Sequence, residues 1–172
     1  MKVAITGHQN GIGAELFRLF TENGFECIGF DKAGQRDPVD IRKLNIKHME
    51  DCDMFINNAW DQFVQVQLFH MVWNEWKNDD TKTIVNISSM NANRDEISTY
   101  NTSKRMLDDL STRSVFQGKC RTHNVKFGWV DTNFVRNKKA TFLMSPEEAA
   151  QMVYDTVLHK YYIPSIGIMA KK

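Results

Sequence analysis

Short apolar runs alternate along the chain with longer segments that have the character of helices. The short runs are bounded by polar residues, which predicts buried strands at 2–5, 27–30, 54–56, 83–87 and 125–130, and a last edge strand at 163–169. Helices are predicted between them at 14–20, 62–77, 102–117 and after Ser145. Strands that alternate with helices predict an α/β fold with a parallel, doubly wound sheet of about six to seven strands. We expect helices on both faces and a single domain spanning 1–172.

Two helical segments differ in how clearly the sequence marks them. Ser145 can cap the last helix, Pro146 suits the first helical position, and Glu148 stands where a capping box places its acid. By contrast, 41–50 has an imperfect apolar pattern. We expect one short helix there, with Ile41, Leu44, Ile46 and Met49 facing inward.

The helix at 62–77 is apolar over most of its circumference. One face of a domain does not suffice to bury such a helix. We therefore expect it to pack on the sheet and also against a second subunit, so that helices 62–77 and 102–117 form the interface of a homodimer or homotetramer. The alternative is a helix buried deep within one subunit.

Composition limits the classes of function. The chain has 172 residues, 42% of them apolar and 25% charged, with a net charge of +1, which is typical of a soluble globular domain. No run of Lys and Arg indicates nucleic-acid binding, and no segment has the apolar length of a membrane span. Cys27, Cys52 and Cys120 lack metal-ligand spacing. We expect buried thiols, no metal and a cytoplasmic location.

A glycine-rich loop, Thr6–Gly13, joins the first strand to the first helix. Glycines let the backbone turn tightly and approach a ligand, and the start of a helix offers N–H groups and a positive dipole end to an anion. Asp31 ends the second strand, roughly 20 residues past the glycines, where a carboxylate suits the hydroxyls of an adenosine ribose. The pattern predicts a Rossmann-like dinucleotide site. An ordinary strand–helix turn with a surface aspartate is the alternative.

Tyr100 and Lys104 lie four residues apart, so they share one face of a helix. A neighbouring ammonium favours the ionised phenol, and lowering its pKa by about 2–3 units requires about 3–4 kcal/mol of differential interaction. The pair is thus a candidate proton donor and acceptor near neutral pH. The spacing alone is common, but here a strand that ends in Ser88 and Ser89 precedes it.

Together these motifs resemble those of the short-chain dehydrogenase/reductase family. The matching segments, in chain order, are Thr6-Gly7-x-x-x-Gly11-x-Gly13, Asn57-Asn58-Ala59, Ile84–Ser89, Tyr100-x-x-x-Lys104 and Phe127–Thr132. Trp60 stands in place of a family glycine, and Phe127 in place of a proline. The resemblance runs from about residue 2 to residue 135, and the presence of all the motifs in order makes chance agreement improbable.

The resemblance implies hydride transfer between a nicotinamide cofactor and a carbonyl or alcohol carbon of a small molecule. Tyr100 would be the general acid/base. Lys104 would lower its pKa and hold the nicotinamide ribose. Ser89, or alternatively Ser88, would hydrogen-bond the reacting oxygen.

The same resemblance implies which residues contact the cofactor at the carboxyl ends of the strands. They are Gly7, Gln9, Asn10, Gly11, Ile12, Gly13, Asp31, Lys32, Asp40, Ile41, Asn58, Ala59, Tyr100, Lys104 and Thr132. Asp31 favours NAD, because its charge would repel a 2′-phosphate. Lys32 beside it leaves NADP possible.

Several features depart from the family. The substrate-binding segment is reduced to 133–144, and the relay asparagine has no secure counterpart, Gln67 and Asn74 being nearest. We expect an open cleft, or one completed by a partner subunit. The alternative functions are a catalytically weak dinucleotide-binding regulatory or scaffold protein and, less favoured by the glycine spacing, a sugar-nucleotide reductase or epimerase.

Overall fold

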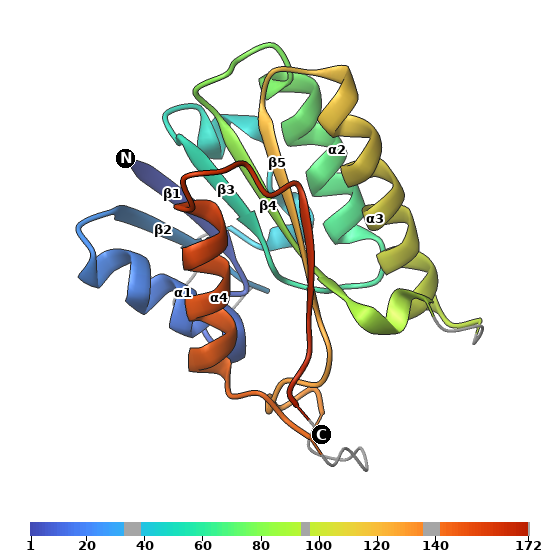
Figure 1. Ribbon diagram of the computed structural model, residues 1–172. Helices are drawn as coiled ribbons and strands as arrows, with labels where there is room; N and C mark the ends of the chain where they lie inside the picture. Colours follow the sequence, from blue (N-terminus) through green and yellow to red (C-terminus); the bar gives the residue numbers. More distant parts are fainter. Residues whose placement is uncertain (33–38, 94–96, 136–141, 172) are drawn as a thin grey trace.

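The computed structural model describes residues 1–32, 39–93, 97–135 and 142–171. Within them, six strands form one parallel sheet in the order β2-β1-β3-β4-β5-β6 (Figure 1). The strands are β1 Lys2–Thr6, β2 Glu26–Phe30, β3 Met54–Asn57, β4 Thr83–Ser89, β5 Arg121–Phe127 and β6 Ser165–Ile168. The predicted α/β fold with a doubly wound parallel sheet is confirmed. All carboxyl ends of these strands point to the same edge, where the ligand sites of such sheets lie.

Four α-helices of the described residues cover the two faces of the sheet. They are α1 Gly11–Glu22, α2 Val64–Trp76, α3 Thr99–Gln117 and α4 Pro146–Val157. Figure 1 shows α1 and α4 on one side of the sheet and α2 and α3 on the other. One core packs Leu16, Phe20 and Val153 against the sheet. The other packs Phe69 and Leu107 against its opposite face.

The segment 41–50 differs from the expected single helix. It forms two 3₁₀ helices, η1 Ile41–Lys43 and η2 Ile46–Met49, and a third, η3 Met90–Asn93, follows β4. The Asp40 side chain accepts from the backbone N–H of Arg42, and that of Asn45 from Lys47. Each polar side chain starts a new turn and thereby competes with a continuous helix. Ile41 and Met49 are nevertheless buried as expected.

Helix α2 is buried mostly by its own subunit. Its buried apolar residues are Val66, Leu68, Phe69, Val72, Trp73 and Trp76. They pack against α3, η2 and the sheet. The Trp73 ring lies where a side chain at Gly118 would be, so glycine there permits the contact. The apolar circumference of α2 therefore does not itself require a partner subunit. Met106 and Phe116 of α3 are exposed.

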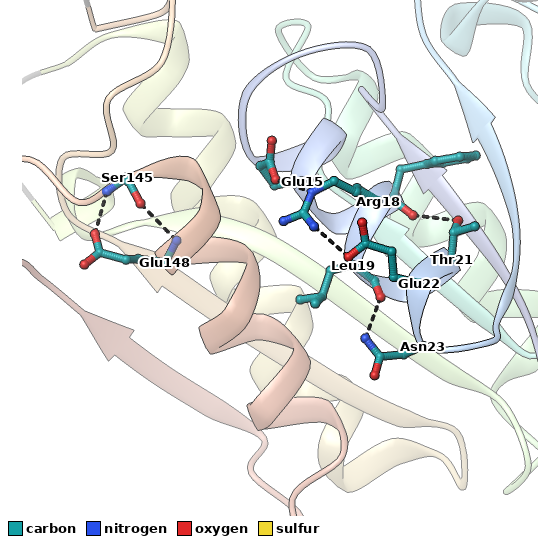
Figure 2. A network of polar contacts seen from close by, with 9 residues as sticks. Glu15, Arg18, Leu19, Thr21, Glu22, Asn23, Ser145 and Glu148 are labelled. Atoms are coloured by element: carbon teal, nitrogen blue, oxygen red, sulfur yellow. Dashed lines mark hydrogen bonds and ion pairs between the residues drawn. The ribbon is translucent and has the colours of Figure 1, made fainter.

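Helix α4 begins with the predicted capping box (Figure 2). The Ser145 N–H donates to Glu148 Oε2 at 2.8 Å, and the Glu148 N–H donates to Ser145 Oγ at 3.1 Å. On the neighbouring α1, the Arg18 guanidinium donates to Glu15 at 2.9 Å and to Glu22 at 2.6 Å. The Arg18 pairs are exposed and contribute little stability. The capping box fixes where α4 starts.

Neither a membrane-spanning helix nor a metal cluster is found in the described part of the chain. No helix there combines the length and the hydropathy needed to cross a bilayer. No group of three or more His, Cys, Asp or Glu side chains there could hold a metal ion. Burial raises the pKa of the Cys52 thiol to about 11 and that of Cys120 to about 12. Both thiols are therefore protonated at neutral pH.

Candidate active site

Thr6 joins the carboxyl ends of β1 and β3. Its Oγ1 accepts from the backbone N–H groups of Asn58 at 2.9 Å and Ala59 at 3.0 Å. Its carbonyl accepts from Asn58 Nδ2 at 3.0 Å. The Asn58 side chain, expected to face the cofactor, therefore also holds the glycine loop onto β3.

The conformation of the glycine loop requires residues that have no side chain. Gly7 and Gly11 have φ of 73° and 56°, in the region that favours glycine. A Cβ at Gly13 would lie 2.0 Å from the Gly7 carbonyl oxygen and 2.6 Å from Asn58 Nδ2. Helix α1 thus packs directly under the loop. No side chain caps its first turn and no acidic residue stands there, so its N–H groups suit an anion.

Asp31 stands at the end of β2, beside the glycine loop. Its carboxylate accepts from the Gln9 N–H at 3.3 Å and from the Lys32 N–H at 2.7 Å. Lys32 Nζ lies 3.4 Å from the Asp61 carboxylate. The Asp40 carboxylate is buried and pairs with the guanidinium of Arg42. Asp40 is thus committed to starting η1, and Asp31 is the carboxylate that borders the cleft.

A cleft of about 330 Å³ lies at the carboxyl edge of the sheet. Most of the predicted site residues line it, namely Gly7, Asn10, Gly11, Ile12, Asp31, Lys32, Ile41, Asn58, Ala59, Ser89, Tyr100, Lys104 and Thr132. The exceptions are Gln9, Gly13 and Asp40. Gln9 is exposed, Gly13 lies beneath the loop, and Asp40 is turned to Arg42.

Ser89, Tyr100 and Lys104 all line this cleft, and both Ser89 and Lys104 lie near Tyr100. Ser89 is the last residue of β4, and Tyr100 lies in the first turn of α3, which Ser98 caps. The Ser89 hydroxyl lies close enough to the Tyr100 phenol to favour its ionised form. Lys104 Nζ lies 5.7 Å from the centre of the Tyr100 ring. Ser88 also lines the cleft, but its hydroxyl is buried and has no partner in the described part of the chain. This geometry favours Ser89 as the partner of Tyr100.

The expectation that Lys104 lowers the pKa of Tyr100 stays a prediction, and in this structure burial and Ser89 act on that pKa. Burial raises the pKa of Tyr100, and the nearby Ser89 hydroxyl offsets only part of that effect. The Lys104 ammonium donates to Gln65 Oε1 and to the Ile87 carbonyl, each at 2.7 Å, and lies 5.7 Å from the centre of the Tyr100 ring. Burial lowers the pKa of Lys104 itself to about 7.

Gln65 is a site residue that the sequence did not reveal. Gln67 and Asn74, the candidates named from the sequence, both lie on the exposed side of α2, and Asn74 contacts the His70 ring. Gln65 is buried and contacts Lys104 directly. The available signal was a lone polar residue at an inward position of a helix that is otherwise apolar there.

Trp60, in place of the family glycine, covers Tyr100. Its ring centroid lies 5.2 Å from that of Tyr100 and 5.7 Å from that of Phe134. Trp60 Nε1 donates to Ser103 Oγ at 3.1 Å, and Ser103 Oγ donates to the Tyr100 carbonyl at 2.9 Å. The indole thereby fixes the first turn of α3 and forms an aromatic wall of the cleft.

Met144, at the end of the segment 133–144, pairs with residues 129–131, while 136–141 lie outside the described residues. Val130 and Met144 form an isolated parallel bridge. The Asp131 N–H donates to the Met144 carbonyl at 2.8 Å, and the Met144 N–H donates to the Trp129 carbonyl at 3.0 Å. Thr132 and Phe134, which follow this pairing in the chain, line the cleft.

No family model matches the chain, and no curated protein sequence does. Solved structures do match. The 3-alpha-hydroxysteroid dehydrogenase from Pseudomonas sp. B-0831 complexed with NADH is 17% identical, with a TM-score of 0.80 over 98% of this chain and 95% of that one. The closed form of serine dehydrogenase complexed with NADP+ is 16% identical, with a TM-score of 0.79 over 98% and 94%.

A short-chain dehydrogenase/reductase from Vibrio parahaemolyticus is 16% identical, with a TM-score of 0.77 over the full length of both chains. The resemblance to the short-chain dehydrogenase/reductase family is thus confirmed in three dimensions across nearly the whole chain. At these identities it is a resemblance of fold, and the chain has the fold of that family.

Proposed function

We propose that the protein is an NAD(P)-dependent oxidoreductase of the short-chain dehydrogenase/reductase type. It would interconvert a carbonyl and an alcohol on a small molecule. The observation that carries the proposal is that Ser89, Tyr100 and Lys104 line the same cleft as the glycine loop and Asp31. Structural neighbours complexed with NADH or NADP+ support it.

A nicotinamide cofactor supplies or accepts the hydride in this chemistry. In the reducing direction, Tyr100 donates its phenolic proton to the carbonyl oxygen as the carbon becomes an alcohol. Ser89 donates a hydrogen bond to the same oxygen and stabilises its alkoxide character. Lys104 would hold the nicotinamide ribose when the cofactor is bound, and would return a proton toward Tyr100. Oxidation runs through the same groups in reverse.

NAD is the proposed cofactor, with NADP possible. Asp31 supports NAD, because its carboxylate borders the cleft beside the glycine loop and would repel a 2′-phosphate. The lysine next to it pairs with Asp61, which reduces its ability to compensate that charge. We propose one cofactor-binding domain over 1–172, with 133–144 as its reduced substrate segment. We also propose a homo-oligomer through α2 and α3, where Met106 and Phe116 are exposed.

Replacing Tyr100 by Phe tests the proposal. NADH oxidation is followed with a panel of aldehydes and ketones, and NAD reduction with the matching alcohols. We expect Tyr100→Phe to lower kcat by about 100-fold or more while leaving NADH affinity within about 3-fold. Tyr154→Phe is the matched control, because Tyr154 packs on Phe20 at the far side of α1. Undiminished turnover in Tyr100→Phe would remove Tyr100 from the mechanism.

A dinucleotide-binding regulatory or scaffold protein is the second candidate. The raised pKa of Tyr100 favours it, because that shift does not match a phenol poised to ionise. Tight NADH binding without turnover across the whole panel would support this candidate.

A further inference from the structure

Gln65 makes three hydrogen bonds with one buried amide. Its Oε1 accepts from Lys104 Nζ at 2.7 Å. Its Nε2 donates to the carbonyls of Asn57 at 2.6 Å and Ile87 at 2.9 Å. The side chain is only 1% exposed. A carboxylate could not donate to the two carbonyls, and an apolar side chain could do none of this, so the contacts match an amide of this length.

The backbone around Gln65 is held as firmly as its side chain. Asn57 Nδ2 donates to the Gln65 carbonyl at 2.8 Å and to Asn86 Oδ1 at 2.9 Å. Asn86 Nδ2 donates to Ser111 Oγ at 2.8 Å. A line of buried polar groups therefore runs from α2 through β3 and β4 to α3. It fixes Gln65 relative to the helix that carries Lys104.

The groups around Lys104 are mostly uncharged. The Lys104 ammonium contacts the Gln65 amide of α2 and the Ile87 carbonyl of β4, and it lies near the phenol ring of Tyr100 on α3. Asp108, one turn further along α3, is the charged group that favours the ammonium. Its carboxylate is shared with β5, because Asn124 Nδ2 donates to it at 2.9 Å and Lys126 Nζ lies 3.9 Å away.

We propose that Gln65 is a positioning residue that fixes the Lys104 ammonium beside Tyr100 and, being uncharged, leaves that lysine able to release and regain a proton. The proposal rests on the proposed function. It adds the direct contact of Gln65 with Lys104, in a chain where the family's relay asparagine has no secure counterpart. The lowered pKa of the buried lysine agrees with this role. A carboxylate at position 65 would instead hold the charge in place.

Two variants separate positioning from mere packing. Gln65→Met keeps the side-chain volume but removes the acceptor for Lys104. Gln65→Glu keeps an acceptor and adds a negative charge. We expect the pKa of Lys104 to fall in the Met variant and to rise in the Glu variant, each by on the order of 1 pH unit. A packing defect would move both in the same direction. Gln67→Met and Gln67→Glu repeat the same changes on the exposed side of α2 and should leave the Lys104 titration unchanged.

The Lys104 titration is read directly, by NMR of isotope-labelled lysine Cε, with the signal assigned by its loss in Lys104→Met. This readout needs no turnover, so it can fail independently of the proposed function. Where the enzyme is active, the pH profile of kcat/KM should move with the NMR midpoint, and Gln65→Met should lower kcat/KM by about 10-fold to 100-fold. Thermal unfolding confirms that each variant is folded. Three results would overturn the proposal. The pKa of Lys104 could shift in the same direction in both Gln65 variants, it could shift in neither, or it could shift equally in the Gln67 controls.

Discussion

The burial of Lys104 should make the protein more stable as the pH rises above neutrality. Its pKa is lowered from 10.5 to about 7 because burial disfavours the ammonium. Between these two values the unfolded chain binds more protons than the folded one, so the free energy of unfolding increases with pH across that window. The cost of burying the charge is fully present below about pH 7 and amounts to about 5 kcal/mol, at about 1.4 kcal/mol per pH unit.

The cost of burying the Lys104 charge is measured by urea unfolding of the wild type and of Lys104→Met at a series of pH values. We expect the wild type to gain about 2–3 kcal/mol relative to Lys104→Met between about pH 6 and about pH 9. The comparison isolates Lys104 because the variant retains the other shifted groups. His123, whose pKa burial lowers to about 4, adds stability as the pH rises to its ordinary value of 6.5.

The buried thiols act in the opposite sense above the pH at which free cysteines ionise, since burial raises the pKa of Cys52 to about 11 and that of Cys120 to about 12. These contributions cancel in the difference between the two proteins. The reasoning would be refuted if the difference in free energy of unfolding between the wild type and Lys104→Met stayed constant within about 0.5 kcal/mol or fell as the pH rises. The lysine would then keep its proton through the window.

Two further substitutions, one of them with a control, test the glycine loop and Asp31. Gly13→Ala should destabilise the fold by about 3 kcal/mol in chemical denaturation, because its Cβ would meet the Gly7 carbonyl oxygen at 2.0 Å. Gly24→Ala, at φ 83° with nothing within 4 Å, should cost only about 1 kcal/mol, and equal losses would contradict the packing argument. Asp31→Ser should reduce the preference for NADH over NADPH by about 10-fold in fluorescence titrations, since it removes the charge beside the 2′ position. An unchanged ratio would exclude Asp31 from cofactor choice.

The sequence predicts those parts of the fold that follow from local pattern. Buried parallel strands are continuous apolar runs, so β1, β3 and β4 were evident, and the capping box set the start of α4. The segment 41–50 was mispredicted because Asp40 and Asn45 bind the backbone two residues on. Apolar spacing takes no account of that competition.

The sequence predicts those site residues that belong to a recognisable motif. It does not predict those that reach the site only through tertiary contacts. Tyr100, Lys104 and the glycines stand in recognisable spacings. Gln65 acquires its place only through partners 8, 22 and 39 residues away, on β3, β4 and α3. The direction of the Lys104 ammonium follows from the same contact. A pair four residues apart on a helix indicates proximity, but it does not say which neighbour the charge will face.

The Thr6 junction has a consequence for how the protein reaches its native state. The bonds from Asn58 and Ala59 to Thr6 span 52 and 53 residues of the chain. The strands β1 and β3 are paired although α1 and β2 lie between them in the sequence. Such non-local contacts form late and slowly. A chain in which these contacts have not formed lacks the Thr6 junction, and a ligand that binds only the completed fold stabilises that fold by an amount that grows with the ligand's concentration. A bound dinucleotide would thus act on the lifetime of the protein as well as on its chemistry.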